Sequence, residues 1–287
     1  MRQEIIDLYD DYTHSRLDRR VFMDRLVKLA GGTAAAAALL PLLRNNYVKA
    51  AIVPEDDPGI QTERVTFQGA SGEMQGYLVR PANALDELPG VVVIHENRGL
   101  NPHTEDVARR MALEGFVALA PDFLSPQGGT PEDEDQARGM IGQLDQQQTT
   151  ENALAAVEFL KDREATTGQV GVIGFCWGGG LANQVAVNSP EVGAVVPFYG
   201  RQPASEDVAK IQAPLLLHYA GNDERINAGI SDYEQALQEA GVEYTIHRYE
   251  GANHAFLNDT NEARYEPEAA ELAWSRTVEF LKQHLAG

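Results

Sequence analysis

The sequence predicts one α/β domain over residues 51–287, with a mostly parallel sheet and helices on both of its faces. First, short strand-like runs alternate with helix-like stretches from residue 60 onward, and alternating βα units build parallel sheets. Second, runs such as G-V-V-V-I-H at Gly90–His95 are continuously apolar, as in strands that are buried on both faces. Third, 287 residues are enough for one large core, and no linker-like stretch divides residues 60–287.

The expected elements follow from apolar runs for strands and from apolar spacing of three and four residues for helices. The expected strands span Thr62–Gln68, Met74–Arg80, Gly90–His95, Phe116–Ala120, Val170–Phe175, Val192–Tyr199, Pro214–Tyr219 and Glu243–Tyr249. The expected helices span Pro102–Glu114, Thr150–Lys161, Gly178–Ser189, Ile230–Ala240 and Ala269–Leu285. The stretch Ser125–Asp135 is rich in Gly, Pro and acidic residues and is predicted to be a loop or lid.

Charge and cysteine content exclude several classes of function. The chain has 23 Lys and Arg against 43 Asp and Glu, a net charge of −20, which repels phosphate backbones and argues against nucleic acid as a partner. The single cysteine, Cys176, excludes an internal disulfide framework and a cysteine-based zinc cluster. Hydrophobic residues make up 43% of the chain, as in ordinary globular proteins, so bulk disorder and a multi-span membrane protein are excluded as well.

Residues 1–50 differ in composition from the rest and form an N-terminal extension. They contain eight basic and six acidic residues, a net charge of +2. No charged residue occurs from Leu29 to Leu43, a stretch too short to span a bilayer but long enough for the apolar part of an export signal. The pair Arg19 and Arg20 resembles a twin-arginine signal, and residues 48–50 offer a cleavage site. This interpretation predicts an exported, periplasmic protein without a stable membrane span.

The same extension has a second interpretation, a helical arm on a cytoplasmic protein. Its first residues place apolar side chains on one face of an amphipathic helix; these are Ile5, Ile6, Leu8, Tyr9 and Tyr12. Such an arm would pack on the domain or on a second copy of the chain, which would make a homodimer. Both interpretations stay open, and residues 1–50 are left out of the argument about chemistry.

The strongest chemical signal is Val170–Gly180, in which an apolar strand runs through G-F-C-W-G into a helix. Cys176 stands where the nucleophile stands in a G-x-S-x-G elbow. Gly174 and Gly178 let the strand and the helix approach closely, and a helix that starts there lowers the pKa of the thiol. The backbone N–H of Trp177 can point at a developing oxyanion. A buried structural cysteine is the alternative, but the strand–turn–helix setting favours a nucleophile.

Two later loops supply an acid and a base. Asp223 follows the apolar strand L-L-L-H-Y-A in the loop G-N-D, and catalytic acids of open α/β sheets stand at such strand ends. His254 lies in the loop Y-E-G-A-N-H-A-F, between the last strand and the last helix. The order Cys176, Asp223, His254 is typical of catalytic triads on this architecture. A helix cap and an ordinary loop histidine are the alternatives for Asp223 and His254 taken singly.

Over residues 60–285 the sequence resembles the dienelactone hydrolase family of α/β-hydrolases. The cysteine in place of serine, the G-F-C-W-G-G-G stretch and the G-N-D and N-H-A-F loops carry the resemblance. It implies an α/β-hydrolase fold and the hydrolysis of an ester or lactone. It also implies, in H-E-N-R-G, that the backbone N–H of Asn97 is a second oxyanion donor and that Glu96 hydrogen-bonds the resting thiol. A plain salt bridge to Arg98 is the alternative for Glu96.

The sequence departs from the family pattern at a position that binds substrate. The resemblance implies an arginine for the substrate carboxylate two residues after the Phe of the histidine loop, where this chain has Asn258. A second family arginine corresponds loosely to Arg138. Arg98 and Arg201, at strand ends, are candidates to replace the lost anion contact, with surface solvation as the alternative for each arginine. The departure bears on the substrate and leaves the hydrolase chemistry intact.

Together these residues predict nucleophilic acyl transfer to water. Cys176 would attack the carbonyl of a small-molecule ester or lactone, and the N–H groups of Asn97 and Trp177 would bind the oxyanion. His254, oriented by Asp223, would move the protons. No metal ion or organic cofactor is required by this chemistry. A carboxylesterase or thioesterase, and a non-catalytic binding protein on the same fold, are the competing hypotheses.

Overall fold

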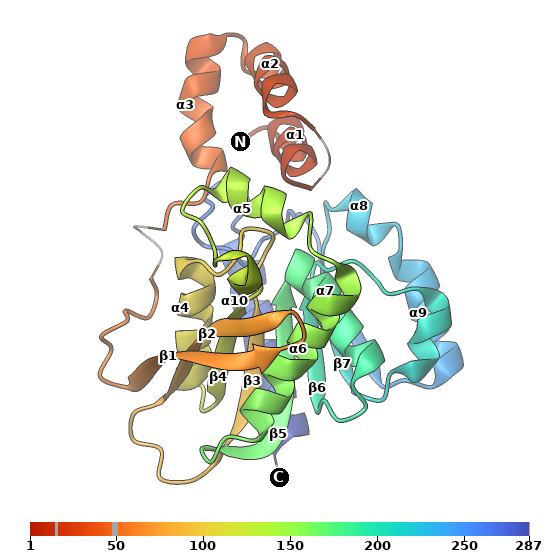
Figure 1. Ribbon diagram of the computed structural model, residues 1–287. Coiled ribbons are helices and arrows are strands. Elements are labelled where there is room, and N and C mark those ends of the chain that lie inside the picture. The colour runs from red at the N-terminus through yellow and green to blue at the C-terminus, as the bar shows by residue number, and fades with distance from the viewer. Residues whose placement is uncertain (15–16, 48–50, 287) are drawn as a thin grey trace.

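The computed structural model describes residues 1–14, 17–47 and 51–286 and confirms the predicted α/β architecture (Figure 1). Its eight-stranded sheet has the order β1-β2-β4-β3-β5-β6-β7-β8. The pairs β1–β2 and β2–β4 are antiparallel, and the other neighbouring pairs are parallel. The strands are β1 (Ile60–Gly69), β2 (Gly72–Pro81), β3 (Leu88–Ile94), β4 (Val117–Asp122), β5 (Thr166–Phe175), β6 (Ala194–Phe198), β7 (Leu215–Ala220) and β8 (Tyr244–Tyr249).

Helices cover both faces of the sheet, and each face has its own core. Successive side chains of a strand point to opposite faces, so Val91 and Val93 of β3 join one core while Val92 and Ile94 join the other. This is why the central strands are continuously apolar. Helices α4 and α10 cover the first core, and α6, α7 and α9 cover the second. These helices are α4 (Pro102–Leu113), α6 (Gln146–Lys161), α7 (Trp177–Asn188), α9 (Ile230–Ala240) and α10 (Pro267–Leu285).

The segment after β4 differs from its prediction as a loop or lid. It contains a short 3-10 helix, η1 (Ser125–Gln127), and its end already belongs to α5 (Glu134–Ile141). The Asp133 side chain accepts hydrogen bonds from the backbone N–H groups of Asp135 and Gln136, which caps α5 at its start. The acidic composition that suggested a loop is therefore, in part, the cap and first turn of a helix. Two other short helices were not predicted, η2 (Ser205–Lys210) and α8 (Glu224–Asn227).

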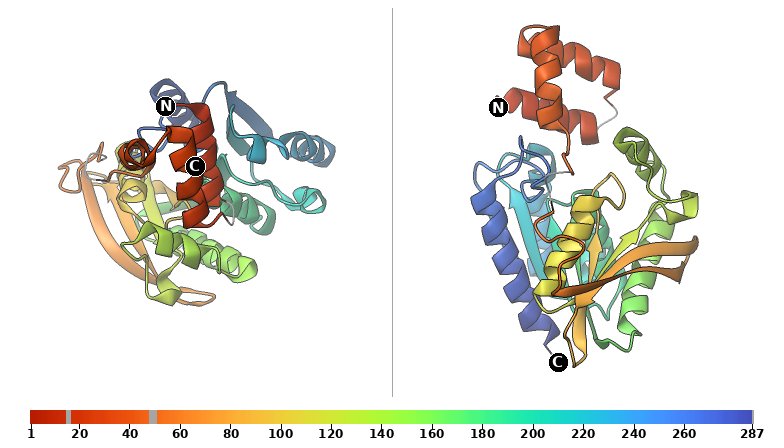
Figure 2. Two further views of the ribbon diagram at one scale, coloured as in Figure 1. Left: turned by 90° about the horizontal axis from the view of Figure 1, so that it is seen from above. Right: turned by 90° about the vertical axis from the view of Figure 1, so that its left-hand side faces the viewer.

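Near the N-terminus, three helices lie together beyond the carboxyl ends of the parallel strands (Figures 1 and 2). The helices are α1 (Gln3–His14), α2 (Arg19–Ala30) and α3 (Thr33–Leu43). Residues Ile5, Leu8, Tyr9 and Tyr12 of α1 are buried in a cluster shared with α2 and α3. We call residues 1–47 the N-terminal arm. The amphipathic helix of the second interpretation is thus present in the structure.

The uncharged stretch Leu29–Leu43 is not one continuous helix. Gly31 and Gly32 have φ angles of 82° and 152°, and this break separates α2 from α3. Within the described part of the chain, no single helix is long and apolar enough to cross a membrane; only α2 and α3 taken together, bent by 113°, meet that test of length and composition. The cleavage site suggested at 48–50 lies outside the described residues. Export by a twin-arginine signal stays a prediction.

Candidate active site

Cys176 occupies a sharp turn between β5 and α7. Its φ and ψ angles are 57° and −113°, a conformation that L-residues adopt only under the constraint of the surrounding fold. A Cβ atom on Gly174 would lie 2.1 Å from the carbonyl oxygen of Gly178, and one on Gly178 would lie 2.4 Å from that of His95. Both glycines are therefore needed for the turn. Helix α7 begins at the next residue, so its positive dipole end faces the sulfur.

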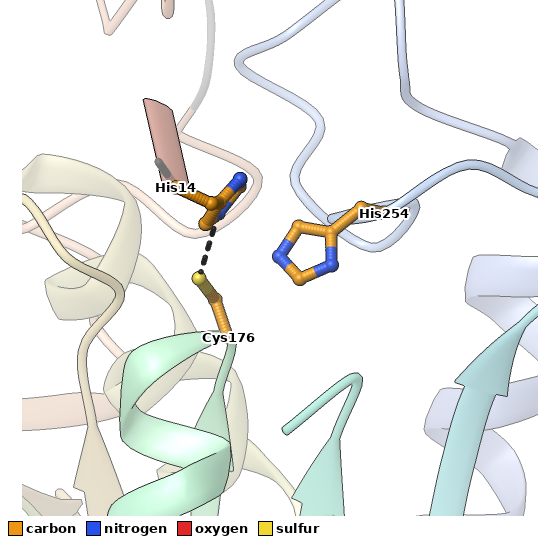
Figure 3. Close-up of side chains that lie close together, drawn as sticks. All are labelled: His14, Cys176 and His254. Atoms are coloured by element: carbon orange, nitrogen blue, oxygen red, sulfur yellow. Dashed lines mark hydrogen bonds between the residues drawn. The ribbon is translucent and has the colours of Figure 1, made fainter. Parts of the chain in front are cut away.

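Asp223 and His254 form a buried pair beside this turn. Nδ1 of His254 hydrogen-bonds Oδ2 of Asp223, and Oδ1 of Asp223 accepts the backbone N–H of Ile226 at 3.2 Å. The His254 side chain is 2% exposed. Because its Nδ1 is taken by the carboxylate, its Nε2 edge faces the sulfur of Cys176 (Figure 3). Nε2 is buried and has no hydrogen-bond partner among the described residues.

The charges of this cluster favour an imidazolium at His254. Burial alone would lower its pKa, but the Asp223 carboxylate and the Cys176 sulfur raise the pKa of His254 to about 10. Burial would likewise raise the pKa of Asp223, and the neighbouring His254 charge and hydrogen bond lower it instead. Each partner therefore stabilises the charged form of the other.

A second histidine, His14 at the end of α1, also contacts the nucleophile candidate. Its Nε2 lies 3.2 Å from Sγ of Cys176 (Figure 3), and its ring meets that of His254 edge-on, with 4.4 Å between centroids. Its Nδ1 lies 2.9 Å from the backbone oxygen of Asp10. A carbonyl oxygen only accepts, so Nδ1 carries the proton. Sequence reasoning missed His14 because it set aside residues 1–50; the amphipathic pattern of α1 was the available signal.

Glu96 lies at the site, but its hydrogen bond goes to Asn258 and not to the thiol. Its Oε2 accepts from the Asn258 amide at 2.9 Å, while its buried Oε1 has no hydrogen-bond partner in the described parts of the chain. The contact to sulfur that the resemblance implies for Glu96 is made here by His14. Asn258, which stands where the resemblance implies an arginine, fixes the orientation of the Glu96 carboxylate.

The two expected oxyanion donors come from adjacent parts of the site. Trp177 opens α7, and Asn97 follows β3, whose end packs against the α7 turn at Gly178. Among the backbone hydrogen bonds of the described turns, loops and caps, none is donated by the N–H of Asn97 or of Trp177. The side-chain amide of Asn97 donates to the backbone oxygen of Thr13 at 2.9 Å, so this residue also holds the arm.

The three candidate arginines differ in their surroundings. Arg98 is 5% exposed and is paired with Glu134 at 2.6 Å, with Tyr9 of the arm as a further partner. Arg138 donates to the backbone oxygen of Tyr12 at 2.7 Å and lies over its ring. Arg201 is exposed, and its guanidinium forms no ion pair with any described residue. Arg201 is thus the arginine of the three that is available to a ligand.

A cavity of about 950 Å³ opens over the sulfur. The arm supplies Thr13 and His14 to its wall, and Arg138 and Arg201 lie on other sides of it. Tyr199, at a φ of 40° after β6, also lines it; its hydroxyl is buried and lacks a partner among the residues described. Neither its position nor its backbone strain was evident from the sequence.

The arm is held at the site by a buried ion pair. Arg264, in the loop before α10, lies 3.0 Å from Asp10 of α1, and its side chain is 4% exposed. It also stacks over the ring of Tyr9 at 5.3 Å. Nearby, the side chain of Gln3 donates to that of Asn253 at 2.6 Å. Sequence reasoning missed Arg264, whose partner is 254 residues away.

Comparison with known proteins identifies the family to which the chain is related. The model of the dienelactone hydrolase family matches residues 74–285, and a separate model, described as YqhI-like, matches residues 1–30. The chain is 34% identical to Protein usf of Aquifex pyrophilus over 232 residues. This alignment covers 78% of this chain and 99% of that protein. It is 32% identical over 234 residues to a Bradyrhizobium protein named "Probable 2-oxo-3-(5-oxofuran-2-ylidene)propanoate lactonase", over 76% of this chain and 93% of the relative.

A solved structure has the same fold. The crystal structure of dienelactone hydrolase from Anabaena variabilis superposes with a TM-score of 0.62 at 25% sequence identity, over 79% of this chain and 99% of that one. The family model covers most of the chain and includes the elbow and both loops of the Asp223–His254 pair. The chain therefore belongs to the dienelactone hydrolase family, within the α/β-hydrolase superfamily.

Proposed function

We propose that the protein hydrolyses an ester or lactone through an acyl-enzyme formed on Cys176. The observation that carries this proposal is the buried Asp223–His254 hydrogen bond, which turns Nε2 of His254 toward the sulfur at the elbow. A nucleophile, a base and a group that orients the base are thus arranged as nucleophilic catalysis requires.

In the first half of the reaction, the sulfur of Cys176 adds to the substrate carbonyl. The sulfur attacks as the thiolate, because its proton already rests on Nε2 of the His254 imidazolium, and the carbonyl electron pair moves onto oxygen. The N–H groups of Asn97 and Trp177 hydrogen-bond this oxyanion, each contributing about 3–4 kcal/mol to the barrier reduction. The carbon–oxygen bond to the leaving group then breaks, and His254 returns the proton to the leaving alkoxide.

In the second half, water cleaves the thioester. His254 takes a proton from the attacking water, the oxyanion forms again, and collapse releases the carboxylic acid product and the thiolate. Asp223 holds Nδ1 of His254 throughout, which keeps Nε2 available for both transfers. Because a thiolate is a better leaving group than an alkoxide, this chemistry favours esters with good leaving groups, such as enol lactones.

The cavity supports a small substrate that carries an anionic group. Arg201 is exposed on the cavity wall and unpaired among the described residues, so it can bind a carboxylate. The Bradyrhizobium relative is named as a lactonase of a lactone that bears a propanoate group, and we propose a lactone or ester with a carboxylate for this chain too.

We further propose that the mature protein retains its arm, because α1 supplies a wall of the cavity and is fastened by the Asp10–Arg264 pair. The mass of the protein recovered from its native cells tests this directly. A mass for the full chain supports retention, whereas a new N-terminus near residue 50 would favour the export interpretation.

Turnover of an activated ester by Cys176→Ala tests the proposed function. We expect activity to be lost while the circular dichroism spectrum stays that of the wild type, since alanine fits the buried turn. His284→Gln, on α10 beside Glu243 and outside the site, serves as a matched control and should keep full activity. Undiminished turnover by Cys176→Ala would refute the nucleophile assignment. A panel of lactones, aryl esters and thioesters separates the lactonase from the esterase and thioesterase alternatives.

A further inference from the structure

Three potential metal ligands converge from distant parts of the chain. Nε2 of His14 lies 3.2 Å from Sγ of Cys176, and one ligand atom each of His14, Cys176 and His254 lie within 4.8 Å of one another (Figure 3). One thiolate and two imidazoles are a donor set that suits Zn²⁺ and other soft or borderline divalent cations. The hydrolytic chemistry proposed above uses the sulfur and His254 but leaves His14 without a role.

The outer contacts of both histidines match those of metal-bound histidines. A ligating histidine donates its second ring N–H to a carboxylate or a backbone carbonyl, which fixes the ring and leaves the other nitrogen free for the metal. Here Nδ1 of His254 is held by Asp223, and Nδ1 of His14 by the backbone oxygen of Asp10 at 2.9 Å. Nε2 of His254, on a side chain that is 2% exposed, has no hydrogen-bond partner among the described residues and is aimed into the cluster.

The arm fixes His14 in place before any ion binds. Asp10, whose carbonyl orients the His14 ring, is itself tied to Arg264 through its side chain. Asn97 holds the backbone of Thr13, the residue before His14, at 2.9 Å. Folding has therefore already ordered this ligand, and binding of an ion loses no further side-chain entropy there. The cavity gives an ion and a water molecule access to the cluster from solvent.

We propose that His14, Cys176 and His254 form a binding site for a soft or borderline divalent cation such as Zn²⁺, which the N-terminal arm completes. The one proton shared by Cys176 and Nε2 of His254 is released to solvent as the sulfur and this nitrogen bind the ion. Three protein ligands leave a fourth position for water from the cavity. The ion and the substrate compete for the same sulfur, so occupancy blocks hydrolysis; this last consequence rests on the function proposed above.

The experiment measures Co²⁺ and Zn²⁺ binding to the full-length protein at equilibrium, without any turnover. Bound Co²⁺ should show a sulfur-to-metal charge-transfer band and the intense visible bands of a four-coordinate ion, and Zn²⁺ should displace it with one ion per chain. His14→Ala removes a ligand and should therefore weaken Zn²⁺ binding by more than the roughly 10- to 100-fold that follows loss of an outer-shell partner of a ligand. Cys176→Ala should abolish the charge-transfer band, and His284→Ala is the matched control that should change neither property.

Equal Zn²⁺ affinity in His14→Ala and the wild type would overturn the proposal, and His14 would then be only a hydrogen-bond partner of the sulfur. A charge-transfer band that survives in Cys176→Ala, or no binding by the wild type, would overturn it as well. Inhibition of ester hydrolysis is measured separately. If Cys176→Ala retains turnover, the proposed function fails while the binding result stands; hydrolysis at full rate by zinc-saturated wild type would instead refute the competition for sulfur.

Discussion

Replacing Arg264 by methionine should detach the N-terminal arm from the active site. The substitution keeps an unbranched side chain of similar length and removes the charge that faces Asp10 at 3.0 Å. It also removes the stacking of the guanidinium over Tyr9. The catalytic domain keeps its sheet and both cores, to which Arg264 does not belong.

The magnitude follows from the burial of the pair. Removing one partner of a buried ion pair costs about 3–5 kcal/mol, because the other charge is left unpaired. The Asp10 side chain is 22% exposed and regains part of its hydration, which places the cost near the lower end, about 3 kcal/mol. Since about 1.4 kcal/mol corresponds to a factor of ten, the detached fraction should rise by about two orders of magnitude.

Hydrogen exchange resolved along the chain measures this change. Amides of α1 should exchange about 100-fold faster in Arg264→Met, while amides of α6 and α10 should exchange as in the wild type. Arg248→Met removes an exposed arginine near Glu250 and should leave α1 protected. Wild-type protection of α1 in Arg264→Met would refute the reasoning. Faster exchange throughout the chain would also refute it, because the ion pair would then stabilise the domain and not the docking of the arm.

Three other variants test the site itself. Asp223→Asn should lower kcat by about four orders of magnitude, as expected when the histidine loses the group that sets its tautomer, and a loss below tenfold in ester turnover would contradict the role of the pair. Gly178→Ala should lower both turnover and Tm, because its Cβ would lie 2.4 Å from the carbonyl oxygen of His95; Gly139→Ala, in α5 with open space around it, is the control for Tm and should not lower it. Arg201→Ala should raise KM for an ester that carries a carboxylate and leave KM for its neutral analogue unchanged. Equal changes for the two esters would show that Arg201 does not bind the anion.

The loops of Cys176 and Asp223 were predictable because each follows a strand with a continuous apolar run, whereas His254 follows the mixed strand Tyr244–Tyr249 and was identified by its place in the chain order. Cys176 comes directly after β5, Asp223 follows β7, and His254 follows β8. Parallel strands bring their carboxyl ends to one edge, so chain order alone indicated that these side chains would meet. How close these side chains come depends on the sharp turn at Cys176 between β5 and α7. The glycines on both sides of Cys176 had already predicted this turn.

The placement of the arm could not be predicted in the same way. Periodicity identifies the apolar face of α1, but it does not say which surface that face meets. The contact between His14 and Cys176 joins residues 162 positions apart, and the pair Asp10–Arg264 spans an even longer stretch. His14 and Asp10 are single residues in a segment that also resembles an export signal. The sequence around them does not indicate that they contact a distant site.

In the loop that carries His254, the departure from the family pattern at Asn258 lies close in sequence to Arg264, the residue that holds the arm. Where the resemblance implies an arginine for the substrate carboxylate, Asn258 donates to Glu96 instead. A positive charge returns six residues later at Arg264, but Asp10 of the arm takes it up. Arg98 is likewise occupied, by Glu134. Both cations are thus held in ion pairs, one of them with the arm. Arg201, by contrast, is exposed on the cavity wall and is the residue that we propose binds a substrate anion.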